Sequence, residues 1–164
     1  MNNIESIVVE LLIKNKMKLA TAESCTGGLI AQKITSVAGA SECFDCGVVT
    51  YSNEQKQKLL GVSKDTLDKV GAVSEQTALE MCKGVKTLSN ADFGISVTGI
   101  AGPGGGTPEK PVGTVWIGIC GESLHKAEKF LFDGNRQQVR ESTANMALKM
   151  VEDAILNEGD NLLI

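Results

Sequence analysis

The stretch Thr21-Ala22-Glu23-Ser24-Cys25-Thr26-Gly27-Gly28 constrains the fold more than any other part of the chain. A short, largely apolar run over 17–20 precedes it, and apolar side chains recur at helical spacing over 29–34. This order predicts a strand, a tight polar turn and the start of a helix, with Ser24 at the carboxyl end of the strand. The N–H groups after Ser24 are expected to lie unpaired at the helix N-terminus, where they can hold negative charge. They belong to Thr26, Gly27 and Gly28.

The sequence leaves two interpretations of this turn open. A serine hydroxyl beside fixed N–H donors supplies what acyl transfer needs, a nucleophile and a site for the oxyanion. The alternative is purely structural, with Ser24 as a helix N-cap and the glycines permitting the turn.

The rest of the chain predicts one domain, residues 1–164, with three layers in the order α/β/α. Helical spacing of apolar residues indicates helices over 4–12, 54–60, 74–88 and 139–159, and a short helix or turn over 63–70. Runs rich in β-branched and aromatic residues indicate strands over 44–51, 93–98, 112–120 and 124–132. Charged side chains place the last strand at an edge of the sheet.

Charge and hydropathy argue against two classes of partner. The net charge is −4, from 16 basic and 20 acidic residues without a long basic run, so the chain lacks the electrostatic footprint of a nucleic-acid-binding protein. No apolar run approaches the roughly 18 residues that span a membrane. A small anionic ligand is compatible with this composition, because a local pocket can be positive on an acidic protein.

The cysteines indicate a reducing compartment. Five are present and no secretion signal precedes them, which predicts reduced thiols in a cytoplasm. The pair Cys43-x-x-Cys46 has the spacing of some zinc and redox sites, but there is no second such pair and His125 is the only imidazole. We therefore predict strand residues here and no metal site, with the role of the pair left open.

A serine nucleophile needs a base, and the sequence favours a lysine over the single histidine. His125 lies in a polar stretch of the expected edge strand, which is typical of a surface imidazole. Lysine can act as a base where desolvation favours the neutral amine. Because carboxyl ends of parallel strands meet at the ligand-binding edge of an open sheet, Ser24 and Tyr51 are predicted to converge there, with Lys56 on the next helix. The alternative for Lys56 is a solvated helix lysine, like Lys58.

Two further features are candidates for binding an anion. A glycine-rich loop over 99–107 follows Thr98 at a third strand end, and its backbone N–H groups can surround a phosphate or sugar. It is not a P-loop, because no Gly-Lys-Ser/Thr follows; the alternative is a mobile connection between two strands. Arg136 and Arg140 lie one turn apart at the start of the last helix. Their planar guanidinium groups can each donate two hydrogen bonds to a phosphate; the alternative is that both side chains are simply exposed to solvent.

Several stretches together resemble one known family. They are Thr21–Gly28, Gly47-Val48-Val49-Thr50-Tyr51-Ser52-Asn53-Glu54-Gln55-Lys56, Gly71-Ala72-Val73-Ser74-Glu75, Gly99-Ile100-Ala101-Gly102-Pro103-Gly104-Gly105-Gly106 and Lys110-Pro111-Val112-Gly113-Thr114-Val115-Trp116. In this order they resemble the C-terminal domain of the competence/damage-inducible protein CinA, over nearly the whole chain. The resemblance implies a three-layer α/β/α sandwich on a mixed, mostly parallel sheet, and a homodimer. Stand-alone members are nicotinamide-nucleotide amidases, which implies hydrolysis of nicotinamide mononucleotide to nicotinate mononucleotide and ammonia in pyridine-nucleotide recycling, with no metal or organic cofactor.

The resemblance also implies roles for individual residues. Ser24 corresponds to the nucleophile and Lys56 to the general base, while Tyr51 and Thr98 match polar groups around the reacting amide. The substrate-binding set joins the turn after Ser24 to the region expected near the nucleotide phosphate. It comprises Thr26, Gly27, Gly28, Thr98, Gly99, Gly102, Gly104, Gly105, Arg136 and Arg140.

Two points limit what the resemblance carries over. Cys46 stands where the family is expected to have a residue such as Arg or Gly, so the contact of such a residue is expected to be missing here. The pyrophosphatase activity of the additional N-terminal domain in larger CinA proteins is not carried over. An alternative function, in another class, is a catalytically silent nucleotide-sensing or interaction domain. Loss of Ser24 or Lys56 would mark it, and both are present.

Overall fold

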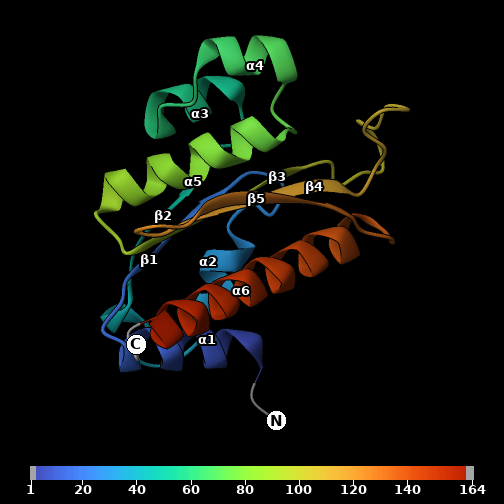
Figure 1. Cartoon of the computed structure of the whole chain (residues 1–164). Coiled ribbons are helices and arrows are strands. Elements are labelled where there is room, and N and C mark those ends of the chain that lie inside the picture. The colour runs from blue at the N-terminus through green and yellow to red at the C-terminus, as the bar shows by residue number, and fades with distance from the viewer. Residues whose placement is uncertain (1–2, 162–164) are drawn as a thin grey trace.

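The computed structural model describes the backbone of residues 3–161 and the side chains of residues 3–158. Helices and strands alternate through residue 60, after which two further helices, three strands and a last helix follow (Figure 1). In chain order the elements are α1 (Ile4–Lys14), β1 (Leu19–Glu23), α2 (Leu29–Thr35), a 3₁₀ turn η1 (Ala40–Glu42), β2 (Phe44–Val49), α3 (Asn53–Leu60), α4 (Lys64–Val70), α5 (Glu75–Ser89), β3 (Phe93–Gly99), β4 (Thr114–Cys120), β5 (His125–Leu131) and α6 (Arg136–Asn161).

The sheet has the strand order β2-β1-β3-β4-β5. β1 is parallel to both of its neighbours, with Ala22 opposite Val48 on β2 and Ser96 on β3. β4 runs antiparallel to β3 and to β5, so it is the one strand of this sheet that points against the others. The α/β fold and the mixed, mostly parallel sheet are confirmed, and β5 is an edge strand as its charges predict.

Helices cover both faces of the sheet (Figure 1). α5 crosses one face with α3 and α4 outside it, and α2 and α6 lie on the other with α1 beyond them. The larger apolar core lies between the sheet and α1, α2 and α6, and includes Leu12, Ile95, Ile117 and Leu148. A smaller core beneath α5 includes Ala22 and Met81. Burial of these two faces fixes the register of the central strands, since a one-residue slip would turn their apolar side chains away from one core.

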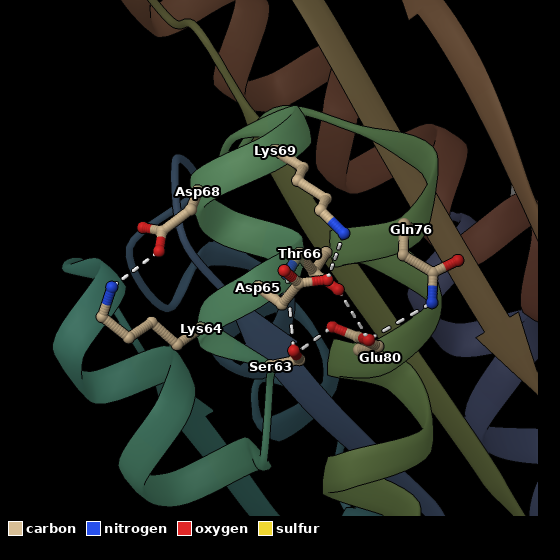
Figure 2. Close-up of polar contacts among 8 residues, drawn as sticks. All are labelled: Ser63, Lys64, Asp65, Thr66, Asp68, Lys69, Gln76 and Glu80. Carbon is tan, nitrogen blue, oxygen red and sulfur yellow. Dashed lines mark hydrogen bonds and ion pairs between the residues drawn. The ribbon is translucent and has the colours of Figure 1, made fainter.

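α3 and α4 lie outside α5, and contacts with α5 hold both helices in place. Glu80 on α5 accepts hydrogen bonds from the Ser63 backbone N–H at 3.2 Å and the Thr66 hydroxyl at 2.9 Å, at the N-terminus of α4 (Figure 2). Gln76 donates to the same carboxylate at 3.2 Å. A negative charge at a helix N-terminus is favourable, so Glu80 ties α4 to α5. The ion pairs Lys64–Asp68 and Lys69–Asp65 in the same view are exposed and contribute little.

α3 itself rests directly on α5. A Cβ atom built on Gly84 of α5 would overlap the carbonyl oxygen of Leu60, the last residue of α3. The two backbones are therefore closer than any side chain at position 84 would allow. α3 is capped by the Ser52 hydroxyl, which accepts from the Gln55 N–H at 3.2 Å, and it ends at Gly61 in the left-handed conformation.

The predicted boundaries differ from the structure at several points. The cap of α3 is Ser52, whereas the sequence pattern favours Asn53. β2 ends at Val49, so Tyr51 lies in the following loop and not on the strand. The segment 63–70 contains a helix, and α6 continues past Gly159 to Asn161 because a single glycine does not end a helix that is already formed. Within the described residues, no helix combines the length and the apolar character that crossing a membrane requires.

Candidate active site

Ser24 follows β1 and is held by the neighbouring strands. Its N–H donates to the Val97 carbonyl of β3 at 3.1 Å, and the Glu23 carbonyl accepts from the Thr50 N–H at 2.9 Å. The chain then reverses through Gly27 and Gly28, whose φ values of +59° and +104° favour glycine. The strand, turn and helix predicted around Ser24 are therefore present, and the hydroxyl lies at the carboxyl edge of the sheet.

Lys56 reaches Ser24 from α3. Its Nζ lies 3.0 Å from Ser24 Oγ and donates a 2.8 Å hydrogen bond to the Thr50 carbonyl. The residue is only 2% exposed, and no carboxylate among the described residues forms an ion pair with it. Burial lowers the pKa of Lys56 because the charged ammonium loses its hydration. Of the two interpretations of Lys56, the structure contradicts the solvated surface lysine.

The Glu23 side chain binds the N-terminal end of α2. Its buried carboxylate accepts from the Thr26 hydroxyl at 2.7 Å, the Ile30 N–H at 2.8 Å and the Ala31 N–H at 3.1 Å. The negative charge at this helix end thus comes from the protein itself. The expectation that Gly27 offers a free N–H is wrong, because this group donates to the Ser24 carbonyl at 3.0 Å and closes the turn.

Arg140 secures the other side of the turn. Its Nε donates to the Cys25 carbonyl at 3.2 Å and its NH2 group to the Thr26 carbonyl at 2.9 Å, while NH1 donates to the Gln137 side chain at 3.0 Å. Since every nitrogen of the guanidinium has a protein acceptor, Arg140 is suited to positioning the Ser24 turn. Glu23 and Arg140 are the residues whose positioning role the sequence did not indicate.

A pocket of about 270 Å³ opens beside Ser24. Its lining comes from the Ser24 turn, the loop after β2, the glycine-rich loop and the start of α6. It comprises Ser24, Cys25, Tyr51, Gly99, Ile100, Ala101, Gly102, Gly104, Gly105 and Arg136. A larger hollow of about 540 Å³ lies between α3 and α5, but it contains neither the serine nor the lysine, so the smaller pocket is the candidate site.

Arg136 bridges two walls of this pocket. Its NH1 donates to the Gly102 carbonyl and its NH2 to the Tyr51 hydroxyl, both at 2.8 Å. Both acceptors are neutral, so the positive charge of Arg136 is not compensated by them. Tyr51 is 63% exposed, which leaves its ring at the mouth of the pocket.

The structure separates the predicted site residues into two groups. Ser24, Tyr51, Arg136 and the predicted loop glycines share the pocket, with Lys56 bonded to Ser24. Outside the lining lie Thr26, Gly27, Gly28, Thr98 and Arg140. Thr98 is buried, and its hydroxyl donates to the Ala72 carbonyl at 2.8 Å, which joins β3 to the loop before α5.

Cys25 is the other nucleophilic side chain beside the pocket. Burial raises the pKa of its thiol to about 11, so it is protonated near neutral pH. A neutral thiol is a weak nucleophile. The hydroxyl bonded to a buried amine therefore remains the better candidate for nucleophilic attack.

The chain combines an α/β/α fold with a buried serine–lysine pair. The comparisons with known proteins agree on the family to which a chain of this kind belongs. The model of the CinA C-terminal domain matches residues 1–155. The chain belongs to the CinA C-terminal domain family. It is similar to a CinA-like protein of Kosmotoga olearia, with 51% identity over 154 residues, which are 94% of this chain and 37% of that protein. The chain thus spans little more than a third of the length of the curated relatives it matches.

Solved structures show the same fold over nearly their whole length. A competence-damaged protein (CinA) superfamily protein from Klebsiella pneumoniae superimposes with a TM-score of 0.90 at 33% identity, covering 95% of this chain and 99% of that one. The competence/damage inducible protein CihA from Agrobacterium tumefaciens gives 0.84 at 41% identity, covering 94% and 96%. The family resemblance expected from the sequence is confirmed.

Proposed function

We propose that this chain is an amidohydrolase that converts nicotinamide mononucleotide to nicotinate mononucleotide and ammonia. The observation that supports it most is the 3.0 Å contact between Lys56 Nζ and Ser24 Oγ in a buried setting. A nucleophile and a base within hydrogen-bond reach, with the base oriented by a third group, are the basis of covalent acyl transfer. Here the third group is the Thr50 carbonyl.

In the first step, neutral Lys56 accepts the Ser24 proton while Ser24 Oγ attacks the carboxamide carbon. The hydrogen bond to the Thr50 carbonyl holds the amine 3.0 Å from Ser24 Oγ, within reach of the proton that its neutral form accepts. The developing oxyanion requires donors near Ser24, and we assign this role to the N–H groups of Thr26 and Gly28, which follow Ser24 in the turn although neither residue lines the pocket. Neither donates to another residue in the part of the chain that the structure describes.

In the second step, the Lys56 ammonium returns the proton to the leaving nitrogen, and ammonia departs. A nicotinoyl ester on Ser24 remains. Water then attacks this ester with Lys56 again as the base, which releases the carboxylate product and restores the serine hydroxyl. The net change is the hydrolysis of one C–N bond, and each proton moves through Lys56.

The phosphate of the substrate is proposed to bind at Arg136 and the glycine-rich loop. Arg136 carries a charge that its Gly102 and Tyr51 acceptors do not neutralise, and Gly104 and Gly105 line the same pocket. Arg140 is a poorer candidate, because its three nitrogens already bond to protein oxygens. Binding energy at the phosphate then holds the ring against Ser24 and aids the chemical step.

The test is ammonia release from nicotinamide mononucleotide by the purified protein and by Ser24→Ala, with chelator present. Release by the unsubstituted protein alone, unchanged by chelator, would support the proposed metal-free serine amidase. Absence of release from the folded protein, with nucleotide binding still detectable by calorimetry, would contradict it and favour a nucleotide-sensing domain.

A further inference from the structure

We propose that Cys82 and Cys120 are an oxidisable pair that a peroxide converts into a reversible disulfide, with Cys120 as the sulfur that reacts with the peroxide first. Neither residue takes part in the chemistry at Ser24. The proposal therefore does not depend on the proposed amidase function.

The pair lies where α5 crosses the end of β4. Cys120 is the last residue of β4 and is directly opposite Gly94 of β3. A Cβ atom on Gly94 would overlap the Cys82 carbonyl oxygen, so this turn of α5 rests on β3 at that point. Side chains of directly opposed residues project from the same face of a sheet, so the Cys120 side chain projects toward the turn of α5 that carries Cys82.

Both side chains lie at the same turn of α5. The two thiols are near enough for a hydrogen bond between them to shift both pKa values, that of Cys120 downward and that of Cys82 upward. The Cys82 thiol donates to the Leu79 carbonyl at 3.2 Å. His125, the β5 residue opposite Cys120, places Nε2 3.1 Å from the same carbonyl. These contacts hold both sulfurs at one place between helix and strand.

The surroundings distinguish the two thiols. Cys120 lines a pocket of about 340 Å³ together with Lys83, Lys86 and His125, so a molecule as small as a peroxide can approach it. The hydrogen bond from Cys82 and the charges of Lys86 and Lys83 lower the pKa of Cys120. The same hydrogen bond and burial raise the pKa of Cys82. Cys120 is itself only 3% exposed, so a peroxide reaches it through this pocket. A thiol with a lowered pKa beside one with a raised pKa is the arrangement of an attacking and a resolving cysteine.

The reaction consumes one peroxide and needs no other reactant. The Cys120 thiolate attacks one peroxide oxygen, the O–O bond breaks, and Cys120 becomes a sulfenic acid while hydroxide leaves and is protonated to water. Cys82 sulfur then attacks the Cys120 sulfur, and the sulfenic oxygen leaves as a second water with the Cys82 proton. Two thiols lose two electrons and the peroxide gains them.

The test treats the full chain with hydrogen peroxide and measures intact mass and free thiols before and after reduction by dithiothreitol. We expect a loss of about 2 Da and of two thiols, both reversed by the reductant, with peptide mapping that joins Cys82 to Cys120. Cys82→Ser keeps the attacking sulfur without its partner, so dimedone should label Cys120 in this variant. Cys120→Ser should abolish the disulfide, and Cys43→Ser, which changes another buried thiol, should leave it unchanged.

Several results would overturn the proposal. One is a disulfide that maps to Cys43 and Cys46, which are close in sequence. Another is dimedone labelling of Cys46 or Cys25 in place of Cys120 in the Cys82→Ser variant. A third is full retention of all thiols in the folded protein, with oxidation only after denaturation. Circular dichroism of each variant establishes that it is folded before its thiols are compared.

Discussion

The guanidinium of Arg136 donates a 2.8 Å hydrogen bond to the phenolic oxygen of Tyr51 across the mouth of the pocket beside Ser24. The contact joins the first residue of α6 to the loop between β2 and α3. In the proposed enzyme, this arginine is the cation available to a substrate phosphate.

Arg136→Ala is therefore expected to raise the KM for nicotinamide mononucleotide about 10- to 100-fold, because charge-assisted hydrogen bonds to the phosphate are lost. Steady-state ammonia release with the nucleotide and with nicotinamide riboside, which has no phosphate, measures the effect. The variant should differ much less from the unsubstituted protein with the riboside. An equal loss with both substrates would show that Arg136 does not bind the phosphate.

Lys56→Met is expected to lower kcat about 10²- to 10⁴-fold while nucleotide binding changes by only a few-fold. Methionine occupies the buried position without an amine, so the base is lost and the apolar stem is retained. Ammonia release and calorimetry of the same preparation separate the two quantities. The matched control is Lys58→Met, an exposed lysine on the same helix, which should be unaffected. Strong loss of binding with turnover intact would contradict the assignment of the base.

The pH dependence follows from burial of Lys56. Because burial lowers the pKa of Lys56 below 10.5, its neutral, basic form is present at lower pH than in a free lysine. We expect kcat/KM to rise with pH through this lowered pKa. The free energy of unfolding changes with pH in the same direction. Between the lowered pKa and 10.5 the unfolded chain binds more protons than the folded chain, so the free energy of unfolding rises with pH in that window. Thermal unfolding of Lys56→Met, measured over the same pH range, should lack this contribution.

Arg140 should affect the chemical step more than binding. Arg140→Ala removes the hydrogen bonds to the Cys25 and Thr26 carbonyls, so the Ser24 turn loses its fixed geometry and kcat is expected to fall about 10²-fold with little change in KM. Arg140→Lys retains one donor and should recover part of kcat. Steady-state kinetics of both variants beside Arg136→Ala distinguish positioning from phosphate binding. A KM effect that dominates in Arg140→Ala would contradict the positioning role.

Cys25 is expected to resist alkylation despite its position beside Ser24. Since its pKa is about 11, the thiolate is scarce near neutral pH and iodoacetamide should leave ammonia release unchanged there. Reactivity should increase only as the pH approaches 11. Mass spectrometry of the labelled peptide, recorded beside activity, measures both. Rapid inactivation at neutral pH with label on Cys25 would contradict its protonated state.

The convergence of Ser24, Tyr51 and the glycine-rich loop could be predicted from the sequence, because each follows a strand end and strand ends of one direction meet at one edge of a sheet. The predictions were weaker where tertiary packing decides the outcome. α3 is largely polar, so its own pattern does not reveal that Lys56 is buried; α3 must first pack on α5. Arg136 and Arg140 are equivalent in the sequence, and only the positions of the surrounding carbonyls separate their roles.

Glu23 and Thr98 are two further residues whose environment depends on tertiary packing and does not follow from the local sequence pattern. A glutamate at the end of a strand ordinarily indicates exposure, and its burial here depends on three donors that the turn brings together after folding. Thr98 lies at the predicted strand end, but its hydroxyl faces the Ala72 carbonyl, because the loop before α5 covers that side of β3. The homodimer implied by the family resemblance stays a prediction, which sedimentation at several concentrations would test.

At Gly84, the absence of a side chain lets α3, the helix that carries Lys56, rest directly on α5. The Leu60 carbonyl at the end of α3 occupies the space that a Cβ atom would need. A larger residue at this position would press on the helix that carries Lys56, although Gly84 does not line the pocket. In the proposed enzyme, the position of the base thus depends on a residue of α5 that lies outside the substrate pocket.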